Sequence, residues 1–224
     1  METLRKPAVR VSGSGLKVLA VVLMTVDHAA AVLMPGDGVA ALALRILGRM
    51  AFPLFAFLLV EGYLHTRSLL RYACAMAVTA LLSEVPYDLA FSGTPWNPAS
   101  QGIMSELLFA LLALAAEDRI PRRGPALLVV AALAVTAEAL HFSYGAGGIA
   151  LTFMLRHMKD SLAGRALLTA CLLPQGAAAA IAVLPMAAYD GTRGFIRSRT
   201  VQYLFYAYYP LHLAALWALA RWSI

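Results

Sequence analysis

The hydrophobic positions of this 224-residue chain form long unbroken runs rather than the one-sided patterns of soluble helices. The run from Leu16 to Met34 reads LKVLAVVLMTVDHAAAVLM, and similar runs follow at 69–89 and 201–220. A helix that crosses a bilayer needs roughly 17 to 25 mostly apolar residues. The pattern therefore predicts an all-α fold, a polytopic helical bundle integral to a membrane.

Breaks between the runs define the expected spans. These are 16–34, 48–64, 69–89, 103–116, 125–140, 147–155 and 201–220, with a short amphipathic piece at 39–47. The stretch from Leu162 to Tyr189 is either one long kinked helix or two short helices that turn at Pro174. The total is about nine transmembrane helices, or eight in the first case. We expect residues 1–15 to form a cytoplasmic tail and residues 16–224 to form a single transmembrane domain.

Composition supports this class of protein and narrows the chemistry. The chain is 61% hydrophobic and 13% charged, and an average soluble domain carries about twice that charge. A cleaved signal peptide is not expected, because the first apolar run contains Asp27 and His28 and has no small-residue cleavage site. Cys74 and Cys171 both fall in expected spans, so we predict neither a disulfide nor a metal site.

The positive charges indicate the orientation of the bundle. Cytoplasmic loops of membrane proteins are rich in Lys and Arg. If the N-terminus is cytoplasmic and the chain crosses nine times, all Lys and Arg residues except Arg45, Arg49 and Arg221 lie on the cytoplasmic side. The net charge of +6 therefore reports topology, and we do not expect nucleic acid as a partner.

Asp27 and His28 are the most informative polar residues, because both lie within the first span. Ionisable side chains in hydrocarbon are costly and generally functional. Successive helix residues point about 100° apart, so Asp27 need not orient the His28 ring. A carboxylate from another helix would fix the tautomer of that ring. A neutral buried histidine is a suitable general base.

Other polar residues are expected to gather in the same outer half of the bundle. These are Arg49, Glu84, Glu106, Glu138 and His212. Two simpler interpretations stay open: Arg49 and Glu84 form a structural ion pair, and His212 is a hydrogen-bonded core residue. At the inner end, Glu61 and His65 share one helix face. A group of arginines crowds the cytoplasmic mouth, and three acidic residues are interpreted as solvated loop charges. The arginines are Arg67, Arg71, Arg193, Arg197 and Arg199, and the acidic residues are Glu117, Asp118 and Asp160.

Several strings in the chain resemble the TraX family, membrane proteins that acetylate the N-terminus of F-type conjugative pilin. In the family's order they are LKVLAVVLMTVDH, RILGRMAFPLFAFLLVEGYLHTRS, LLSEVPYDLAF, SYGAGG, YDGTRG and FYAYYPLHL. A more distant similarity is to the transmembrane acyltransferases that O-acetylate polysaccharides. That superfamily has a basic residue ahead of a first-helix histidine, as Lys17 and His28 are here, an arginine pair like Arg67 and Arg71, and a terminal Tyr…His string.

The resemblance implies an acetyltransferase of the bacterial cytoplasmic (inner) membrane, with acetyl-CoA as the donor substrate and no metal. The acceptor is an N-terminal amine of a membrane-embedded peptide such as pilin. It implies His28 as general base, oriented by Asp27, Glu84 or Glu106, with Arg49 stabilising the oxyanion. The residues expected to line the CoA site are Lys17, Arg67, Arg71, Arg193, Glu61, Tyr209 and His212.

The sequence also allows three other functions. In the first, the acetyl group is transferred to an envelope glycan instead of a peptide. Alternatively, the buried Asp, His and Glu residues form the proton relay of a small-solute transporter, although no inverted repeat, which many transporters contain, is visible. In the third alternative, the protein is a non-enzymatic factor for pilus or envelope assembly.

Overall fold

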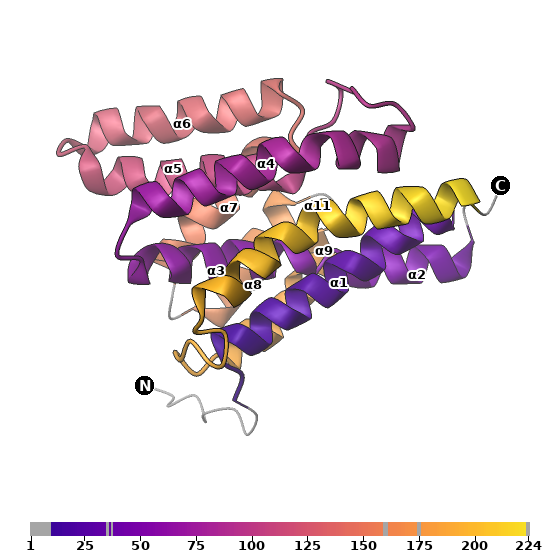
Figure 1. The fold of residues 1–224 in the computed structure, drawn as a ribbon. Helices are drawn as coiled ribbons and strands as arrows, with labels where there is room; N and C mark the ends of the chain where they lie inside the picture. The colour runs from indigo at the N-terminus through magenta and orange to yellow at the C-terminus, as the bar shows by residue number, and fades with distance from the viewer. Residues whose placement is uncertain (1–9, 35, 37, 159–160, 174–175, 223–224) are drawn as a thin grey trace.

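The structure, a computed structural model, describes residues 10–34, 36, 38–158, 161–173 and 176–222. All regular elements among these residues are helices (Figure 1). They are α1 (Gly13–Leu33), α2 (Val39–Gly48), α3 (Ala51–His65), α4 (Leu69–Ser92), α5 (Ile103–Arg119), α6 (Arg123–Ala139), α7 (Gly145–His157), α8 (Leu162–Leu172), α9 (Gly176–Ala179), the 3-10 turn η1 (Ala180–Ala182), α10 (Val183–Ala187) and α11 (Arg199–Trp222).

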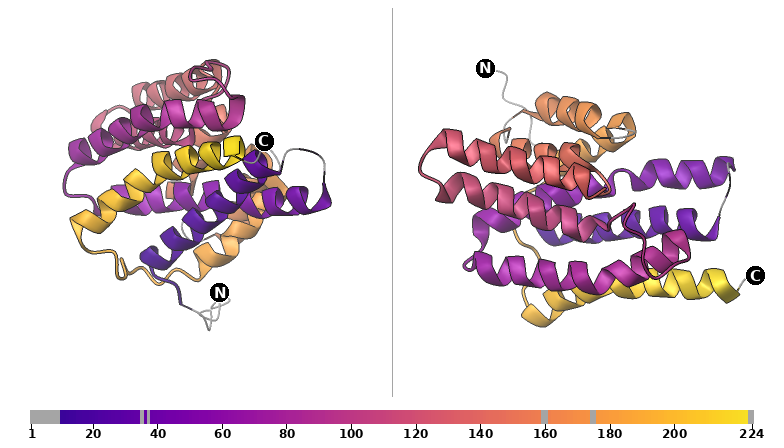
Figure 2. Two further views of the ribbon diagram at one scale, coloured as in Figure 1. Left: turned by 45° about the vertical axis from the view of Figure 1, so that its right-hand side comes forward. Right: turned by 90° about the horizontal axis from the view of Figure 1, so that it is seen from above.

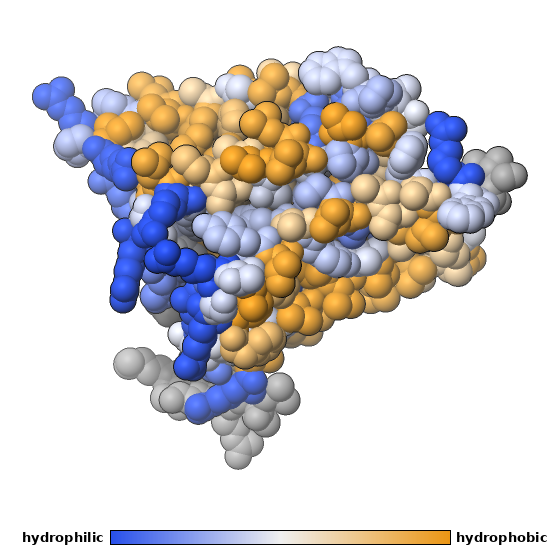
Figure 3. All heavy atoms as spheres, in the orientation of Figure 1, coloured by the Kyte–Doolittle hydropathy of each residue, from blue (hydrophilic) through white to orange (hydrophobic). Residues whose placement is uncertain are grey.

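The long helices lie roughly along one axis, and successive ones run in opposite directions (Figures 1 and 2). Helices α1, α4 and α11 begin at one end of the bundle, which we call the basic end. Its exposed arginines are Arg10, Arg67, Arg71, Arg119, Arg122, Arg123, Arg193, Arg197 and Arg199. In Figure 3 hydrophilic side chains gather at this end on the left, and apolar side chains cover most of the remaining face. This distribution agrees with the predicted crowding of arginines.

Local sequence signals explain where several helices begin and end. The hydroxyl of Ser12 caps α1 by accepting a hydrogen bond from the Gly15 amide, and Ser68 caps α4 in the same way. Such caps satisfy amides that have no partner within the helix. Helix α4 ends at Gly93, whose left-handed φ of 72° suits a residue without a Cβ.

Three helical stretches are long and apolar enough to cross a bilayer: Gly13–Leu33, Val39–His65 and Leu69–Ser92. The second joins α2 to α3 across Arg49 and Met50, which keep helical backbone angles. The predicted short piece at 39–47 corresponds to α2, and the predicted span at 48–64 corresponds to α3. The structure adds that α2 and α3 follow each other as one apolar stretch of bilayer length.

Residues 162–187 form a helical hairpin rather than one long kinked helix. Helix α8 and the segment α9–α10 contact each other, and the turn between them lies outside the described residues. The amide of Val11 then donates to the Ala188 carbonyl at 2.9 Å, which returns the chain to the start of α1. Eleven residues of α8 extend about 16 Å, whereas the hydrocarbon core is about 30 Å thick. Each arm is therefore shorter than a typical span.

The core lies where α3 packs against α1, α5 and α7. Phe52 and Leu54 of α3 and Leu111 and Leu114 of α5 are fully or almost fully buried. Glycine at position 48 permits the closest approach of α1 and α2, because a Cβ there would overlap the Asp27 side chain. This contact fixes the direction in which Asp27 points.

Candidate functional site

His28 of α1 and His212 of α11 form a hydrogen-bonded pair in the half of the bundle away from the basic end. The Nδ1 atom of His28 lies 2.8 Å from Nε2 of His212, and Nδ1 of His212 lies 3.0 Å from the Tyr208 carbonyl oxygen. A carbonyl only accepts, so His212 Nδ1 carries the proton and, in the neutral ring, Nε2 accepts. His28 therefore donates from Nδ1, and its Nε2 keeps a free lone pair.

Aromatic rings from α4 and α11 surround this histidine pair. Phe91 meets the His28 ring edge-on with centroids 5.3 Å apart, and the Tyr209 centroid lies 6.3 Å away. His28 is half-buried and His212 is buried. We expected a carboxylate to orient the His28 ring. Instead, the partner of His28 Nδ1 is the imidazole of His212. The prediction that His212 is a hydrogen-bonded core residue is confirmed, and the hydrogen bond joins it to His28.

Asp27 faces a different helix from its neighbour. Its Oδ1 atom lies 3.7 Å from Arg45 and 3.6 Å from Arg49, both contributed by the α2–α3 helix. The interpretation of Arg49 and Glu84 as an ion pair was wrong, since the close packing at Gly48 brings Asp27 to Arg49 first. Arg49 also interacts with the hydroxyl of Tyr144.

Glu106 and Glu138 hold the beginning of α7, within the SYGAGG string. Glu106 is fully buried and accepts a hydrogen bond from the Tyr144 amide at 2.8 Å. Glu138 accepts one from the Ala146 amide at 3.0 Å. A carboxylate at a helix N-terminus satisfies free amides and complements the helix dipole. Gly148 is needed in this string because a Cβ there would overlap the Glu106 carboxylate.

The acidic residues of α4 lie beside the loop that joins α4 to α5. Asp88 is buried and its Oδ2 accepts a hydrogen bond from the Asn97 amide at 2.8 Å. Tyr87 pairs with the Ser100 hydroxyl at 3.0 Å. Glu84 lies near the Gly102 backbone and interacts electrostatically with Asp88. These side chains hold the loop in place. In the described part of the chain, the hydrogen bonds of the His28 and His212 ring nitrogens do not include Glu84.

The YDGTRG string forms a loop clamped onto the start of α1. Ser14 donates its hydroxyl to the Arg193 carbonyl at 2.6 Å and accepts from the Ile196 amide at 2.8 Å. Asp190 accepts two hydrogen bonds from Thr192, and the Thr192 hydroxyl, with its amide, holds the pKa of the Asp190 carboxyl below its usual range. The loop therefore presents Arg193 at the basic end.

Lys17 lies close to this loop, with its ammonium 5.4 Å from the Phe205 ring centroid and within electrostatic reach of Arg193. Arg67 and Arg71 are exposed at the start of α4. Glu61 lies 3.9 Å from His65 on α3, as their spacing predicted, and it also interacts with Tyr189. The described contacts do not join Glu61 to the histidine pair.

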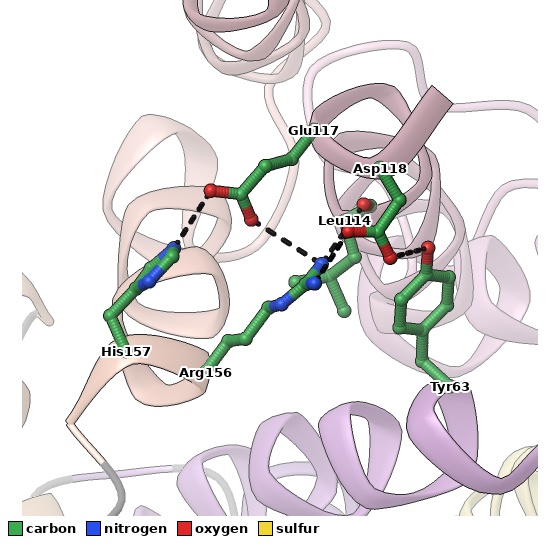
Figure 4. A network of polar contacts seen from close by, with 6 residues as sticks. All are labelled: Tyr63, Leu114, Glu117, Asp118, Arg156 and His157. Carbon is green, nitrogen blue, oxygen red and sulfur yellow. Dashed lines mark hydrogen bonds and ion pairs between the residues drawn. The ribbon is translucent and has the colours of Figure 1, made fainter. Parts of the chain in front are cut away.

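Arg156 of α7 links three helices at the basic end (Figure 4). Its guanidinium lies 2.5 Å from Asp118 and 3.3 Å from Glu117, and His157 lies 3.0 Å from Glu117. Tyr63 donates to Asp118 at 2.6 Å. The hydrogen bond from Arg156 and that from Tyr63 lower the pKa of the Asp118 carboxyl. Glu117 and Asp118 were interpreted as solvated loop charges. Asp118 is exposed, but both residues belong to α5 and form ion pairs, because α7 folds back onto α5. Asp160 lies outside the described residues.

Arg165, which was expected on the cytoplasmic side within the stretch from Leu162 to Tyr189, is a buried residue of α8. It donates to the Met158 carbonyl at 2.9 Å and lies over the Phe57 ring. Two cavities are also distant from the histidine pair. One of about 140 Å³ is lined by Glu117 and Phe153, and an apolar groove of about 530 Å³ runs between α8 and α10.

The structure thus groups most of the predicted residues into two sets between the helices and one set at the basic end. His28, Tyr209 and His212 form one set, and Asp27, Arg49 and Glu106 surround Tyr144 in the second. Lys17, Arg67, Arg71 and Arg193 belong to the basic end.

An all-helical bundle with apolar helices of membrane length and ionisable groups buried between them has the features of a membrane protein. The chain belongs to the TraX family, since the family model described as TraX protein matches residues 12–220. It is also similar to a protein of Dichelobacter nodosus named "Probable fimbrial assembly protein FimC, serogroup H1". The two are 25% identical over 229 residues, 90% of this chain and 92% of the relative. No solved structure matches significantly.

Proposed function

We propose that this protein is an integral membrane acetyltransferase that moves an acetyl group from acetyl-CoA to an N-terminal amine of a pilin-like membrane acceptor. The observation that carries the proposal is the hydrogen-bond chain from His28 through His212 to the Tyr208 carbonyl. This chain leaves His28 Nε2 unprotonated and ready to accept a proton. A positioned general base of this kind typically contributes 10²- to 10⁴-fold to a rate.

The reaction follows from these groups. His28 takes a proton from the acceptor amine, whose nitrogen attacks the thioester carbonyl carbon of acetyl-CoA. Arg49 stabilises the resulting oxyanion, because a fixed positive charge in a water-poor site is effective there. The carbon–sulfur bond then breaks, and the proton held by His28 passes to the leaving thiolate of CoA. Asp27 keeps Arg49 in position, and Glu106 does so indirectly through Tyr144.

Donor binding is assigned to the basic end. Arginine and lysine suit the phosphate groups of CoA, and guanidinium pairs their oxygens bidentately. The Ser14 clamp presents Arg193 beside Lys17, and Arg67 and Arg71 lie at the same end. Along α1, Lys17 and His28 are about 16 Å apart at 1.5 Å per residue. An extended pantetheine arm spans a distance of this order, so CoA would enter from the cytoplasm and present its thioester near His28.

As part of this proposal, we expect a multi-pass protein of the bacterial inner membrane with nine crossings, two of them formed by the short hairpin of α8 to α10. Alternating helix directions support this count. The fimbrial assembly name of the similar protein supports a pilin-like acceptor. Acetylation of an envelope glycan is the alternative within the same chemistry, and its hydroxyl acceptor would need the same base.

The proposal is tested with the full chain in lipid nanodiscs and radiolabelled acetyl-CoA. Wild-type protein is expected to transfer label to a peptide with a free N-terminal amine, and His28→Gln is expected to reduce transfer by at least about a hundredfold. His141→Asn is a matched control, because His141 is exposed and asparagine tolerates its φ of 57°. Full transfer by a folded His28→Gln protein would refute the assignment of the base.

A further inference from the structure

Buried polar atoms without a hydrogen bond gather in the half of the bundle away from the basic end. Among the described residues, five oxygens there have no hydrogen bond within 3.5 Å: Asp27 Oδ1, Glu84 Oε1, Asp88 Oδ1, Glu106 Oε1 and Tyr209 Oη, the last of which lies near the Ile103 backbone. Asp27 still has its two arginines within 4 Å. Buried polar groups in native proteins are nearly always paired with protein or a bound molecule. Such a concentration therefore indicates a place for a ligand that donates hydrogen bonds.

The balance of charged side chains in this half of the bundle favours a positively charged ligand. The described carboxylates there are Asp27, Glu84, Asp88, Glu106 and Glu138, and the arginines are Arg45, Arg49 and Arg221. Five carboxylates against three arginines leave a formal excess of two negative charges, the opposite of the basic end. A positively charged group entering this half is therefore attracted, whereas the phosphates of CoA are not.

Glu84 and Tyr209 are the pair best placed to receive such a group. Glu84 shares one face of α4 with Tyr87 and Phe91, at spacings of three and seven residues, and α4 packs along α11. The Tyr209 side chain is only 4% exposed, and its hydroxyl interacts electrostatically with Glu84 and Tyr87. The Tyr209 ring lies beside His28, so one residue joins the acidic group to the base.

We propose that Glu84 and the Tyr209 hydroxyl bind the acceptor's amine in its ammonium form and select it over a hydroxyl. This inference rests on the proposed function for the identity of the ligand. An ammonium brings a positive charge and three N–H donors, whereas a hydroxyl brings one donor and no charge. The rings of Tyr87, Phe91 and Tyr209 add cation–π attraction. The ammonium first gives one proton to the Glu84 carboxylate and becomes the neutral amine. The amine gives its second proton to His28 Nε2 as its nitrogen attacks the thioester. His28 then passes that proton to the leaving thiolate, and Glu84 releases its proton to solvent.

Binding of two synthetic apolar peptides to the full chain in nanodiscs tests this subsite. One peptide has a free N-terminal amine, and the other has a hydroxyl in its place. Wild-type protein should bind the amine peptide more tightly, and Glu84→Gln should weaken that binding by about ten- to a hundredfold, the range for a hydrogen bond to a charged group. Tyr209→Phe should weaken it by several-fold. The weaker binding of the hydroxyl peptide should not change in Glu84→Gln.

Glu138→Gln is the matched control, because Glu138 undergoes the same change but caps α7. Glu84→Asp, which keeps the charge, should restore part of the preference for the amine. Equal binding of the amine peptide by wild type and Glu84→Gln would overturn the proposal, as would an equal loss for both peptides. Transfer of the labelled acetyl group is measured separately. If the protein binds the amine peptide through Glu84 but transfers no acetyl group, the proposed reaction is refuted and the proposed amine subsite stands.

Discussion

Asp27 and His28 are adjacent in the chain, yet their side chains contact different helices. Asp27 faces Arg45 and Arg49 of the α2–α3 helix, whereas His28 forms a hydrogen bond with His212 of α11. One turn of α1 therefore joins the ion cluster to the histidine pair. In the proposed reaction the first holds the oxyanion-stabilising arginine and the second holds the base, so this turn positions both groups relative to each other.

Replacing His212 by phenylalanine should lower kcat for acetyl transfer by about ten- to a hundredfold. Phenylalanine keeps a ring against Tyr209 but removes the nitrogen that accepts from His28, so the His28 tautomer is no longer fixed. The KM for acetyl-CoA should stay within about twofold, because CoA phosphates bind at the other end. An unchanged kcat would contradict the positioning role of His212.

Gly48→Ala should destabilise the protein by about 1–3 kcal/mol, the usual range for overpacking a close contact. The added Cβ would overlap Asp27 and separate α1 from α2. Gly38→Ala is the matched control, since no atom lies within 4 Å of a Cβ at that position and its φ of −65° suits alanine. Thermal unfolding in detergent compares the two. Equal unfolding temperatures would show that the α1–α2 contact relaxes freely.

Arg193→Gln should raise the KM for acetyl-CoA by about tenfold, since a charge-assisted hydrogen bond to phosphate contributes roughly 1.5–3 kcal/mol. The kcat should change little, because this residue lies far from His28. Arg123→Gln removes an exposed charge from the same end of the bundle and serves as control. The difference between the variants should shrink at high salt, because screening weakens exposed charge pairs. Identical KM values would remove Arg193 from the donor site.

Asp118→Asn should reduce stability near neutral pH by about 0.5 kcal/mol, a small effect because the Asp118 side chain is 43% exposed. Arg156 lowers the pKa of Asp118 in the folded state. The pair therefore contributes above the unfolded pKa of about 3.9, and the contribution is lost as pH falls through the lower folded value. Denaturant unfolding at pH 7 and at about pH 2.5 measures this difference. A gap of equal size at both values would exclude the ion pair as its cause.

The positions of most helices could be predicted from the sequence, because each apolar run must bury its backbone polar groups in a helix when it enters a bilayer. The alternation of arginines with the runs likewise predicted that they would gather at one end, and the structure confirms this. The different directions of Asp27 and His28 also follow from helical geometry alone.

Partners between distant helices were decided only by tertiary packing. His28 and His212 are 184 residues apart, and no local pattern states which of several buried groups meets the His28 ring. Similarly, the missing Cβ of Gly48 brings Asp27 to the arginines of α2–α3, and the return of α7 onto α5 brings Arg156 to Asp118. The sequence determined the helices, the basic end and the family strings. Contacts across the bundle depend on how all helices pack at once, so only the tertiary structure decided the pairs.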